Sequence, residues 1–386
     1  MIVTHLTLSD FRNYTSLDVE LLPGPNLFVG SNGQGKTNLV ESLGYLSTLG
    51  SHRVSSDQAM IRQGQETAII RARLAHDGRE LLAEVELNRS SPNRAQVNRS
   101  AIKTRELPRY FSSVLFAPED LALVRGEPSG RRRFMDELLV LRAPRMSGVL
   151  ADYERVLRQR NTLLKSARSS GIKENQLGTL EIWDDRLVSL GTELIRARAQ
   201  LVSELAPEVE RAYAAIAGAD HAATLSSQLS ILASNPDSDE NESSATVDEV
   251  PSVDRVTTDF RSSLARLRRA ELDRGVTLAG PHRDDLVLGL NGMPARGYAS
   301  HGESWSFALA LKLASAAVLR RESSSGDPVL VLDDVFAELD ESRRSRLGSA
   351  VADFEQVLIT AAVFDDVPSE LATHVVRIRA GEVVEE

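Results

Sequence analysis

The sequence contains no cysteine. That absence excludes disulfide bonds, thiolate zinc sites and cysteine nucleophiles. No apolar run approaches the length needed to cross a bilayer, so we expect no membrane association. The N-terminus, Met-Ile-Val-Thr-His, lacks a basic segment followed by an apolar core, which favours a cytoplasmic protein. The seven histidines show no spacing typical of metal ligands, so the sequence predicts no zinc site.

Basic residues are fewer than acidic ones, and the net charge is −10. Residues 235–254 account for most of that imbalance, because they include seven acidic residues and no basic one. We expect this polar, Ser-rich segment to be disordered or to form a surface insertion. The net charge therefore does not argue against a nucleic-acid partner, since the distribution of charge matters more than its sum.

One stretch combines a buried strand, a glycine-rich loop and a helix. Residues 27–29 are apolar, and Leu39, Val40, Leu43 and Leu46 have helical spacing. The loop between them fits the pattern G-x-x-x-x-G-K-[ST], with the residues Gly30, Ser31, Asn32, Gly33, Gln34, Gly35, Lys36 and Thr37. Such a loop binds phosphates through backbone N–H groups. We therefore predict ATP as ligand, with Lys36 on the β- and γ-phosphates and Thr37 on Mg²⁺.

A second apolar run delivers two carboxylates. Residues 328–332 read as a buried parallel strand, and Asp333 and Asp334 follow directly. In a phosphate-loop ATPase the first carboxylate holds the Mg²⁺ shell, and the second is placed to polarise the attacking water. We therefore predict Asp333 as a metal residue and Asp334, with Lys36, as catalytic. Strands often end in Asp turns, so this prediction depends on the phosphate loop.

The pattern of elements predicts two lobes. Alternating residues predict strands at 2–8, 17–21, 68–76, 80–88 and 286–290, and a closing hairpin over 375–384. Helical spacing covers 130–142, 146–168, 178–216, 257–274 and 303–321, with a bend near 169–171. We predict an α/β ATPase head, with a mixed parallel and antiparallel sheet, formed by 1–110 and 255–386. Residues 111–234 are predicted to form an inserted helical arm.

A short motif opens the helix that precedes the carboxylates. Ser300 and Gly302, in Ala299-Ser-His-Gly-Glu303, have the Ser-x-Gly form of the signature of ABC-type ATPases. Ser-x-Gly before a helix is by itself typical of a helix cap. The order of phosphate loop, signature, Asp-rich strand and Leu339-Asp340 loop nevertheless resembles the ABC-type ATPases of DNA repair and chromosome organisation. In those proteins the signature of one subunit caps the γ-phosphate bound by another.

Within that class the chain closely resembles the RecF family over nearly its whole length. The resemblance includes the phosphate loop and further stretches, which are Leu8-Ser-Asp-Phe-Arg-Asn-Tyr14, Ser51-His-Arg53, Phe116-Ala-Pro-Glu-Asp-Leu121, Arg131-Arg-Arg-Phe-Met-Asp136, Gly280-Pro-His-Arg-Asp-Asp285 and Leu332-Asp-Asp-Val-Phe-Ala-Glu-Leu-Asp340. It implies a recombination mediator that dimerises on ATP and binds duplex DNA beside single-stranded gaps. It also implies weak DNA-stimulated ATP hydrolysis, RecO and RecR as partners, and help in loading RecA. Glu303, where the signature usually has Gln, departs from the commoner pattern.

Arginines are the candidates for DNA contact. Residues 125–168 carry eleven basic and five acidic residues, a surplus that suits a phosphate backbone. Candidate contacts are Arg131, Arg132, Arg133, Arg155, Arg158 and Arg160. The alternative is a solvated helix face with local ion pairs, or an arm–lobe junction for residues 131–133. Arg53, after the first helix, is a candidate for nucleotide contact or a plain surface residue.

Three other functions fit less well. An ABC-transporter subunit has no need of an Arg-rich helical arm of this size. A chromosome-scale SMC or zinc-hook ATPase requires hundreds of coiled-coil residues, and the hook a Cys-x-x-Cys. A metabolic kinase is disfavoured by the signature and the Leu-Asp loop.

Overall fold

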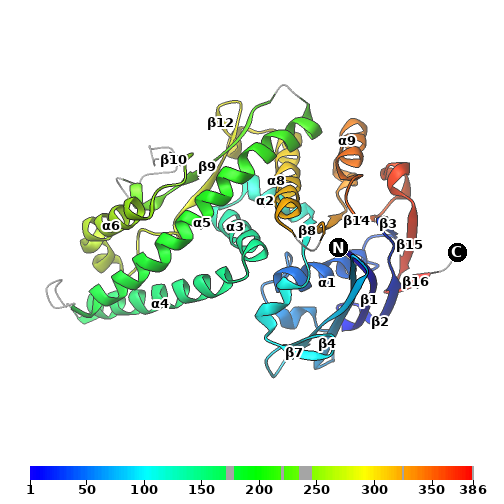
Figure 1. Ribbon diagram of the computed structural model, residues 1–386, viewed down its shortest axis with the longest axis horizontal. Helices are drawn as coiled ribbons and strands as arrows, with labels where there is room; N and C mark the ends of the chain where they lie inside the picture. Colours follow the sequence, from blue (N-terminus) through cyan, green and yellow to red (C-terminus); the bar gives the residue numbers. More distant parts are fainter. Residues whose placement is uncertain (171–177, 219–220, 234–245, 324–325, 385–386) are drawn as a thin grey trace. The chain divides into compact units, whose positions relative to one another are not determined.

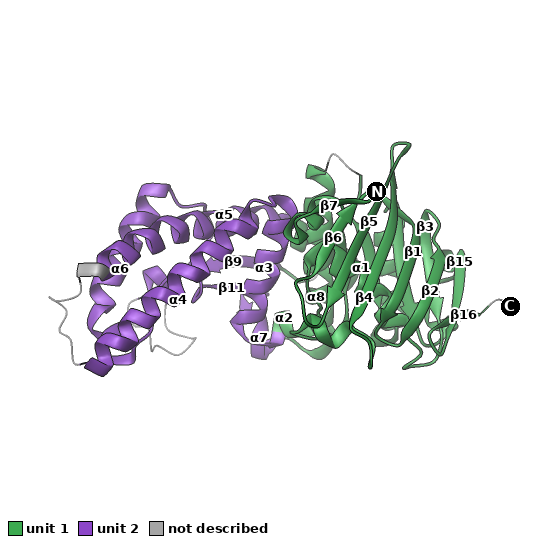
Figure 2. Ribbon diagram, turned by 90° about the horizontal axis from the view of Figure 1, so that it is seen from below, with its two compact units in different colours: residues 1–124, 208–222, 299–386 green, residues 125–207, 223–298 purple. Residues whose placement is uncertain are grey.

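The computed structural model describes residues 1–170, 178–218, 221–233, 246–323 and 326–384. These residues form two compact units, coloured separately in Figure 2. Unit 1 comprises Met1–Val124, Glu208–Ala222 and Ala299–Glu386, and unit 2 comprises Arg125–Pro207 and Ala223–Tyr298. Among the described residues, no helix is long and apolar enough to cross a membrane.

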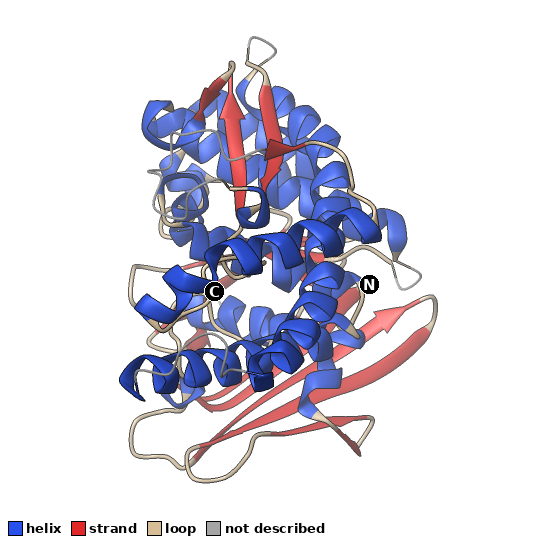
Figure 3. Ribbon diagram, turned by 90° about the vertical axis from the view of Figure 1, so that its left-hand side faces the viewer, coloured by secondary structure: helices blue, strands red, loops and turns tan. Residues whose placement is uncertain are grey.

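Unit 1 contains an antiparallel sheet, which we call sheet A. Its strand order is β2-β1-β4-β5-β6-β7, and its long strands are visible in Figure 3. The strands are β1 (Ile2–Phe11), β2 (Tyr14–Glu20), β4 (Thr67–His76), β5 (Arg79–Asn88), β6 (Arg94–Val97) and β7 (Ser100–Ile102). The strands predicted at 68–76 and 80–88 are confirmed as β4 and β5, which pair as a hairpin. Asp77 and Gly78 between them both have positive φ, as a tight two-residue turn requires.

The second sheet of unit 1, sheet B, carries the phosphate loop. Its order is β16-β15-β3-β14-β13-β8, and every neighbouring pair except β15–β16 is parallel. The strands are β3 (Gly24–Val29), β8 (Ser113–Phe116), β13 (Val329–Asp333), β14 (Gln356–Ala361), β15 (His374–Arg379) and β16 (Glu382–Val384). The predicted strands before both site motifs are confirmed. Because β3 and β13 are parallel and each pairs with β14, their carboxyl ends meet at one edge.

Helix α1 (Lys36–Thr48) packs on both sheets of unit 1. Its buried side chains, including Leu39, Val40, Leu43 and Leu46, join one hydrophobic core with residues of sheets A and B. Figure 1 shows α1 beside the strands of sheet A. The unit is completed by α8 (His301–Glu322), α9 (Glu341–Val351) and most of α2 (Leu121–Arg125).

Unit 2 is mainly helical. Its helices are α3 (Pro128–Arg142), α4 (Met146–Ser170), α6 (Val253–Arg274), α7 (Ala295–Tyr298) and the part of α5 (Gly178–Ala217) up to Pro207. A small antiparallel sheet of order β10-β9-β11-β12 lies with them. Its strands are β9 (Ala223–Gln228), β10 (Thr246–Val247), β11 (Asp285–Leu290) and β12 (Met293–Pro294). Asn291 and Gly292, which join β11 to β12, both have positive φ, as a two-residue hairpin turn requires.

The unit boundaries differ from the predicted lobes. Residues 111–124, expected in the arm, include β8 and belong to unit 1, whereas 255–298, expected in the ATPase lobe, belong to unit 2. The physical reason is strand pairing, because β8 hydrogen-bonds to β13 and β11 to β9. Of the predicted bend near 169–171, residues 169 and 170 form the end of α4, and residue 171 lies outside the described residues. Most of the acidic segment also lies outside the described residues. Its described end, 246–254, forms β10 and the start of α6.

Candidate nucleotide-binding site

The loop between β3 and α1 has the backbone that its glycines permit. Gly33 and Gly35 have φ of 81° and 119°, which residues with a side chain rarely adopt. At Gly30 a Cβ would stand 2.2 Å from the carbonyl oxygen of Ile378, so β15 packs directly on the loop's first residue. Ser31, Asn32 and Gly33 are exposed. The loop thus offers backbone to solvent just before the N-terminus of α1, the arrangement that binds phosphate.

Lys36 begins α1 and is buried, with 3% of its surface exposed. Its Nζ donates to the carbonyl oxygens of Gly30, at 2.7 Å, and Ser31, at 3.4 Å. The ammonium therefore bonds to the first two residues of the loop that precedes it. It is a positive charge held over the position where phosphate oxygens bind in a loop of this type.

Gln34 fastens the loop to two other segments. Its carbonyl oxygen accepts hydrogen bonds from Nδ2 of Asn13 and the N–H of Gly381, both at 3.0 Å. Its Oε1 accepts from the N–H of Ala380, at 2.6 Å. Tyr14, at the start of β2, donates its hydroxyl to the carbonyl oxygen of Gly35. Sequence reasoning missed these supports, because residues 13, 14, 380 and 381 carry no phosphate-binding pattern of their own.

Asp333 ends β13 and meets Thr37 across the site. Its Oδ1 accepts hydrogen bonds from the hydroxyls of Thr37, at 3.0 Å, and Thr360, at 2.6 Å. The side chain is 2% exposed, and burial, reinforced by the charge of Asp334, raises the pKa of Asp333 to about 6. The structure thus brings together the two residues predicted to share a metal ion.

The oxygen chemistry of this pair fits Mg²⁺. A hydroxyl and a carboxylate are hard ligands of the kind that Mg²⁺ takes alongside substrate phosphates. The raised pKa of Asp333 reflects a carboxylate whose partners among the described residues are hydroxyls rather than cations. A divalent cation would compensate that charge. Thr37 and Asp333 are the residues that would hold it.

Asp334 follows with a φ of 51°, a left-handed conformation that Asp tolerates better than most residues. Its N–H donates to Oγ1 of Thr360, at 2.9 Å. Thr360 therefore bonds to both aspartates, to the carboxylate of Asp333 and to the backbone N–H of Asp334. Asp334 is less buried than Asp333, as a residue that meets water must be.

A cavity of about 520 Å³ adjoins the first turn of α1, and Arg53 lines it with residues that include Arg12, Asn13 and Asn38. The guanidinium of Arg53 donates to Oδ1 of Asn38, at 2.7 Å. Behind it, the buried carboxylate of Glu41 accepts two hydrogen bonds from Arg12. Arg53 is thus held beside α1 by side-chain bonds. Its contact with nucleotide stays a prediction.

Ser300 caps α8, as the plainer interpretation of the Ser-x-Gly motif predicts. Its Oγ accepts from the N–H of Glu303, and Oε2 of Glu303 accepts from the N–H of Ser300, at 2.7 Å. These bonds to Ser300 lower the pKa of Glu303. A Cβ on Gly302 would lie 3.1 Å from the guanidinium of Arg343. Glu303 therefore has a local structural role in a capping box.

The arginines predicted to contact DNA fall into two groups. Arg160 is fully buried, where it pairs with Asp184 and Glu271, and Arg131 is buried against Asp285. Neither guanidinium is available to a phosphate backbone, which corrects the prediction for these two residues.

The other four candidates differ. Arg133, Arg155 and Arg158 are exposed and each pairs with an acidic residue on its own helix, and Arg132 is half-buried. DNA contact by these four stays a prediction.

Comparisons with known proteins agree with this geometry. The profile of the family described as "RecF/RecN/SMC N terminal domain" matches residues 2–382. The chain is 66% identical to "DNA replication and repair protein RecF" of Clavibacter michiganensis subsp. michiganensis, over 100% of this chain and 96% of that one. It is also 66% identical to the protein of that name from Leifsonia xyli subsp. xyli, over the full length of both.

A solved structure of a RecF protein is also similar to this chain. It is described as "Structure of the recombination mediator protein RecF-ATP in RecFOR pathway", and it superposes with a TM-score of 0.87, at 28% identity, over 100% of this chain and 97% of that one. The predicted fold class, an α/β ATPase head with an inserted helical arm, is confirmed.

Proposed function

This chain belongs to the RecF family of DNA replication and repair proteins, and from that premise we propose that it is an ATP-switched DNA-binding protein of recombinational repair. One observation carries the proposal: Thr37, at the start of α1, and Asp333, at the end of β13, share a hydrogen bond beside a phosphate-binding loop. The likeness to a structure of RecF with ATP supports ATP as the nucleotide.

Each residue of the site has a distinct task in this proposal. Backbone N–H groups of residues 30–37 and the ammonium of Lys36 bind the phosphates, and Thr37 and Asp333 hold Mg²⁺. Mg²⁺ neutralises charge on the phosphate oxygens when it is bound. Asp334 polarises the water that attacks, and Arg53 lines the cavity that receives the nucleoside.

The signature completes the site across a dimer of two copies. Ser300 and Gly302 lie at the N-terminus of α8, where a hydroxyl and backbone N–H groups favour an anion. In the proposed dimer they face the γ-phosphate bound by the partner subunit. ATP thereby holds the dimer together, and slow, DNA-stimulated hydrolysis releases it, so that the protein is a switch rather than a metabolic enzyme.

We further propose that the ATP-bound dimer recognises duplex DNA next to a single-stranded gap. The similar RecF–ATP structure is that of a protein of the RecFOR pathway, which supports RecO and RecR as partners. In this proposal, the three proteins together promote RecA loading. Exposed arginines on α3 and α4, Arg133, Arg155 and Arg158, are the candidate contacts.

Light scattering of the protein with and without ATP tests the dimer. ATP should double the mass, and a gapped duplex should bind only in its presence. Ser300→Arg should leave ATP binding by the monomer intact and abolish the dimer, whereas Asp334→Asn should slow hydrolysis and prolong the dimer. Ser349→Arg, at another exposed serine of unit 1, is the control. A Ser300→Arg protein that dimerises normally would contradict the composite site.

A further inference from the structure

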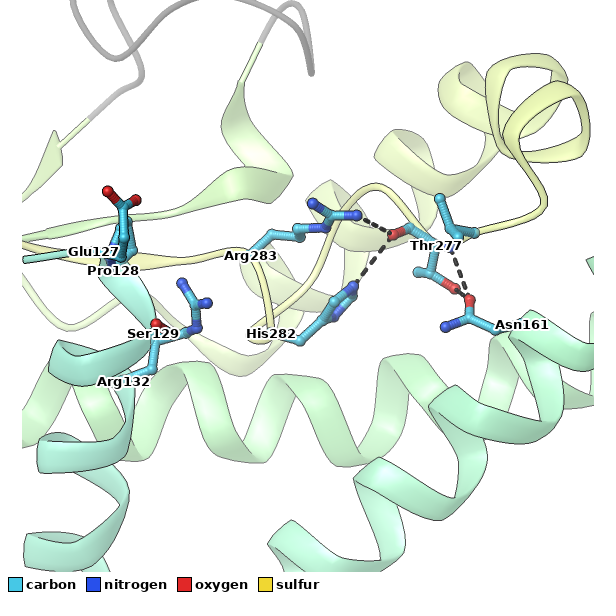
Figure 4. Close-up of a pocket in the computed structure, with 9 residues that line it drawn as sticks. Glu127, Pro128, Ser129, Arg132, Asn161, Thr277, His282 and Arg283 are labelled. Atoms are coloured by element: carbon cyan, nitrogen blue, oxygen red, sulfur yellow. Dashed lines mark hydrogen bonds between the residues drawn. The ribbon is translucent and has the colours of Figure 1, made fainter. Parts of the chain in front are cut away.

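A second polar cavity lies within unit 2, and none of its lining residues is one that we assigned to ATP above. Its volume is about 450 Å³, and Figure 4 shows its walls: the first turn of α3, residue 161 of α4 and the loop that follows α6. The side chains that matter here are Arg132, Arg283, Asn161, His282, Ser129 and Glu127. A volume of this size suits a small organic ligand.

Two guanidinium groups in this cavity have only backbone partners. Arg132 donates to the carbonyl oxygen of Asp284, at 2.8 Å, and Arg283 to that of Thr277, at 3.4 Å. Within the described chain neither forms a salt bridge. Burial, followed by the nearby charge of Arg198, lowers the pKa of Arg132. Because the described partners of both guanidinium groups are backbone carbonyl oxygens, no paired carboxylate compensates their positive charge.

The carboxylates near the cavity are largely engaged elsewhere. Glu127, Asp285 and Asp136 form salt bridges with Arg296, Arg131 and Arg198, respectively. The fourth carboxylate, Asp284, accepts two hydrogen bonds from Ser230. Asp284 is the one carboxylate of this set without an arginine pair. Two arginines facing one unpaired carboxylate leave a surplus of positive charge.

Neutral donors face the same space. Oδ1 of Asn161 accepts from the N–H and the hydroxyl of Thr277, which fixes the amide so that Nδ2 points away from Thr277 (Figure 4). Nδ2 has no acceptor among the residues that the structure describes. The hydroxyl of Ser129, in the first turn of α3, likewise has no partner there. Both groups can donate to a ligand oxygen.

His282 shapes the cavity without adding charge. Its Nε2 lies 3.3 Å from the carbonyl oxygen of Thr277, and its Nδ1 lies 2.8 Å from the hydroxyl of Tyr153. A carbonyl only accepts, so Nε2 carries the proton and Nδ1 accepts from Tyr153. Burial lowers the pKa of His282 to about 3, so the ring is neutral at pH 7. The charge of the cavity therefore comes from Arg132 and Arg283.

We propose that this cavity binds a phosphate monoester, with Arg132 and Arg283 pairing the dianion and Asn161 and Ser129 donating to its oxygens. Guanidinium groups bind phosphate through paired, charge-assisted hydrogen bonds. A monoester presents three terminal oxygens and close to two negative charges, which suits four donors better than a carboxylate or a backbone diester does. The group occurs on free nucleotides and at the 5′ ends of nucleic-acid strands.

Calorimetric titration of the full-length protein tests the proposal with defined probes at fixed salt. The probes are inorganic phosphate, thymidine 5′-monophosphate, and a trinucleotide with either a 5′-phosphate or a 5′-hydroxyl. The three phosphorylated probes should bind, and the hydroxyl trinucleotide should not. Equal affinity for the monophosphate and the phosphorylated trinucleotide assigns the site to free nucleotides, and tighter binding of the trinucleotide assigns it to strand ends.

Variants locate the binding. Arg283 is exposed and makes one long hydrogen bond, so Arg283→Gln should fold normally and weaken the phosphorylated probes about tenfold or more. Arg186→Gln, at an exposed arginine of the same unit that has no assigned role, is the control and should change their affinity less than about twofold. The proposal is overturned if the hydroxyl trinucleotide binds equally well, if Arg283→Gln changes nothing, or if only Lys36→Ala removes the binding, which would place it at the phosphate loop.

Discussion

Two aspartates, one in each unit, both have a raised pKa, but the charges around them are opposite in sign. Burial raises the pKa of both Asp333 and Asp284 to about 6. Asp333 faces hydroxyls and a second carboxylate, so its surroundings lack positive charge. Asp284 lies among arginines that include Arg198 and Arg132. Unit 1 therefore offers negative charge to a cation, and unit 2 offers positive charge to an anion.

The arginines of unit 2 also differ from one another in burial. The first prediction, which has the largest expected effect, tests that difference. Arg160 is fully buried and binds Asp184, Glu271 and Thr277. Arg160→Ala would leave Glu271 as an uncompensated buried charge, so we expect a loss of about 3–5 kcal/mol in the free energy of unfolding. Urea denaturation measures it.

Arg158→Ala is the matched control, because Arg158 is two residues away and exposed. It should change stability by no more than about 0.5 kcal/mol. ATP affinity should be unchanged in any Arg160→Ala protein that remains folded, since the nucleotide residues all lie in unit 1. An equal loss of unfolding free energy in both variants would mean that the buried ion pairs of Arg160 stabilise the fold no more than the exposed pair of Arg158 does.

The sequence predicted unit 1 better than unit 2 for a physical reason. A phosphate loop is a local pattern, so a strand, a spacing of glycines and a helix identify Lys36 and Thr37 without knowledge of the fold. Arg131, Arg132 and Arg133 are also adjacent in sequence, yet one is buried, one lines a cavity and one is exposed. Their surroundings are determined by β11 and α4, which pack against α3 only in the folded chain. Surplus charge in a segment therefore could not distinguish arginines that bind carboxylates from arginines that face a ligand.

The second prediction concerns the positive charge of unit 1. Lys36→Ala should lower ATP affinity about ten- to a hundredfold, because a charge-assisted contact contributes about 1.5–3 kcal/mol. Lys36 is buried, and its Nζ donates to the carbonyl oxygens of Gly30 and Ser31. We therefore also expect a small loss of apo stability.

Calorimetric titration with ATP measures the effect of Lys36→Ala on affinity. Lys103→Ala, an exposed lysine of the same unit, is the control and should bind ATP normally. Unchanged ATP binding in Lys36→Ala would remove the phosphate-loop assignment.

The third prediction uses the two aspartates directly. The pKa of Asp333 in the folded apo protein, about 6, lies above the unfolded value of about 3.9. The fold therefore favours the protonated form, and stability falls as pH rises between those values. Asp333→Asn should remove this fall and raise apo stability at pH 7 by about 1–3 kcal/mol. It should also abolish the stabilisation that Mg²⁺ adds to the ATP complex.

Asp284→Asn is the comparison, because its pKa is raised to the same value by the same cause. Asp284→Asn should reduce the fall in stability over the same pH range. It should leave intact the stabilisation that Mg²⁺ adds to the ATP complex. Thermal melts of both variants from pH 4 to pH 8, with and without Mg²⁺ and ATP, separate the two. If Asp284→Asn also removed the Mg²⁺ effect, the two carboxylates would not serve separate sites.

The smallest expected effect concerns Glu303, whose carboxylate accepts from the N–H of Ser300 and lies 3.9 Å from His221. Gln keeps a side-chain oxygen acceptor for that N–H and loses only the charge near the start of α8. Glu303→Gln should therefore cost about 0.5 kcal/mol or less, and Glu303→Ala, which loses the reciprocal cap, about 1 kcal/mol. Chemical denaturation measures both values. ATP-induced dimers should persist in the Gln variant, since Ser300 remains the cap. Weaker dimers at unchanged stability would instead place Glu303 against the partner's nucleotide.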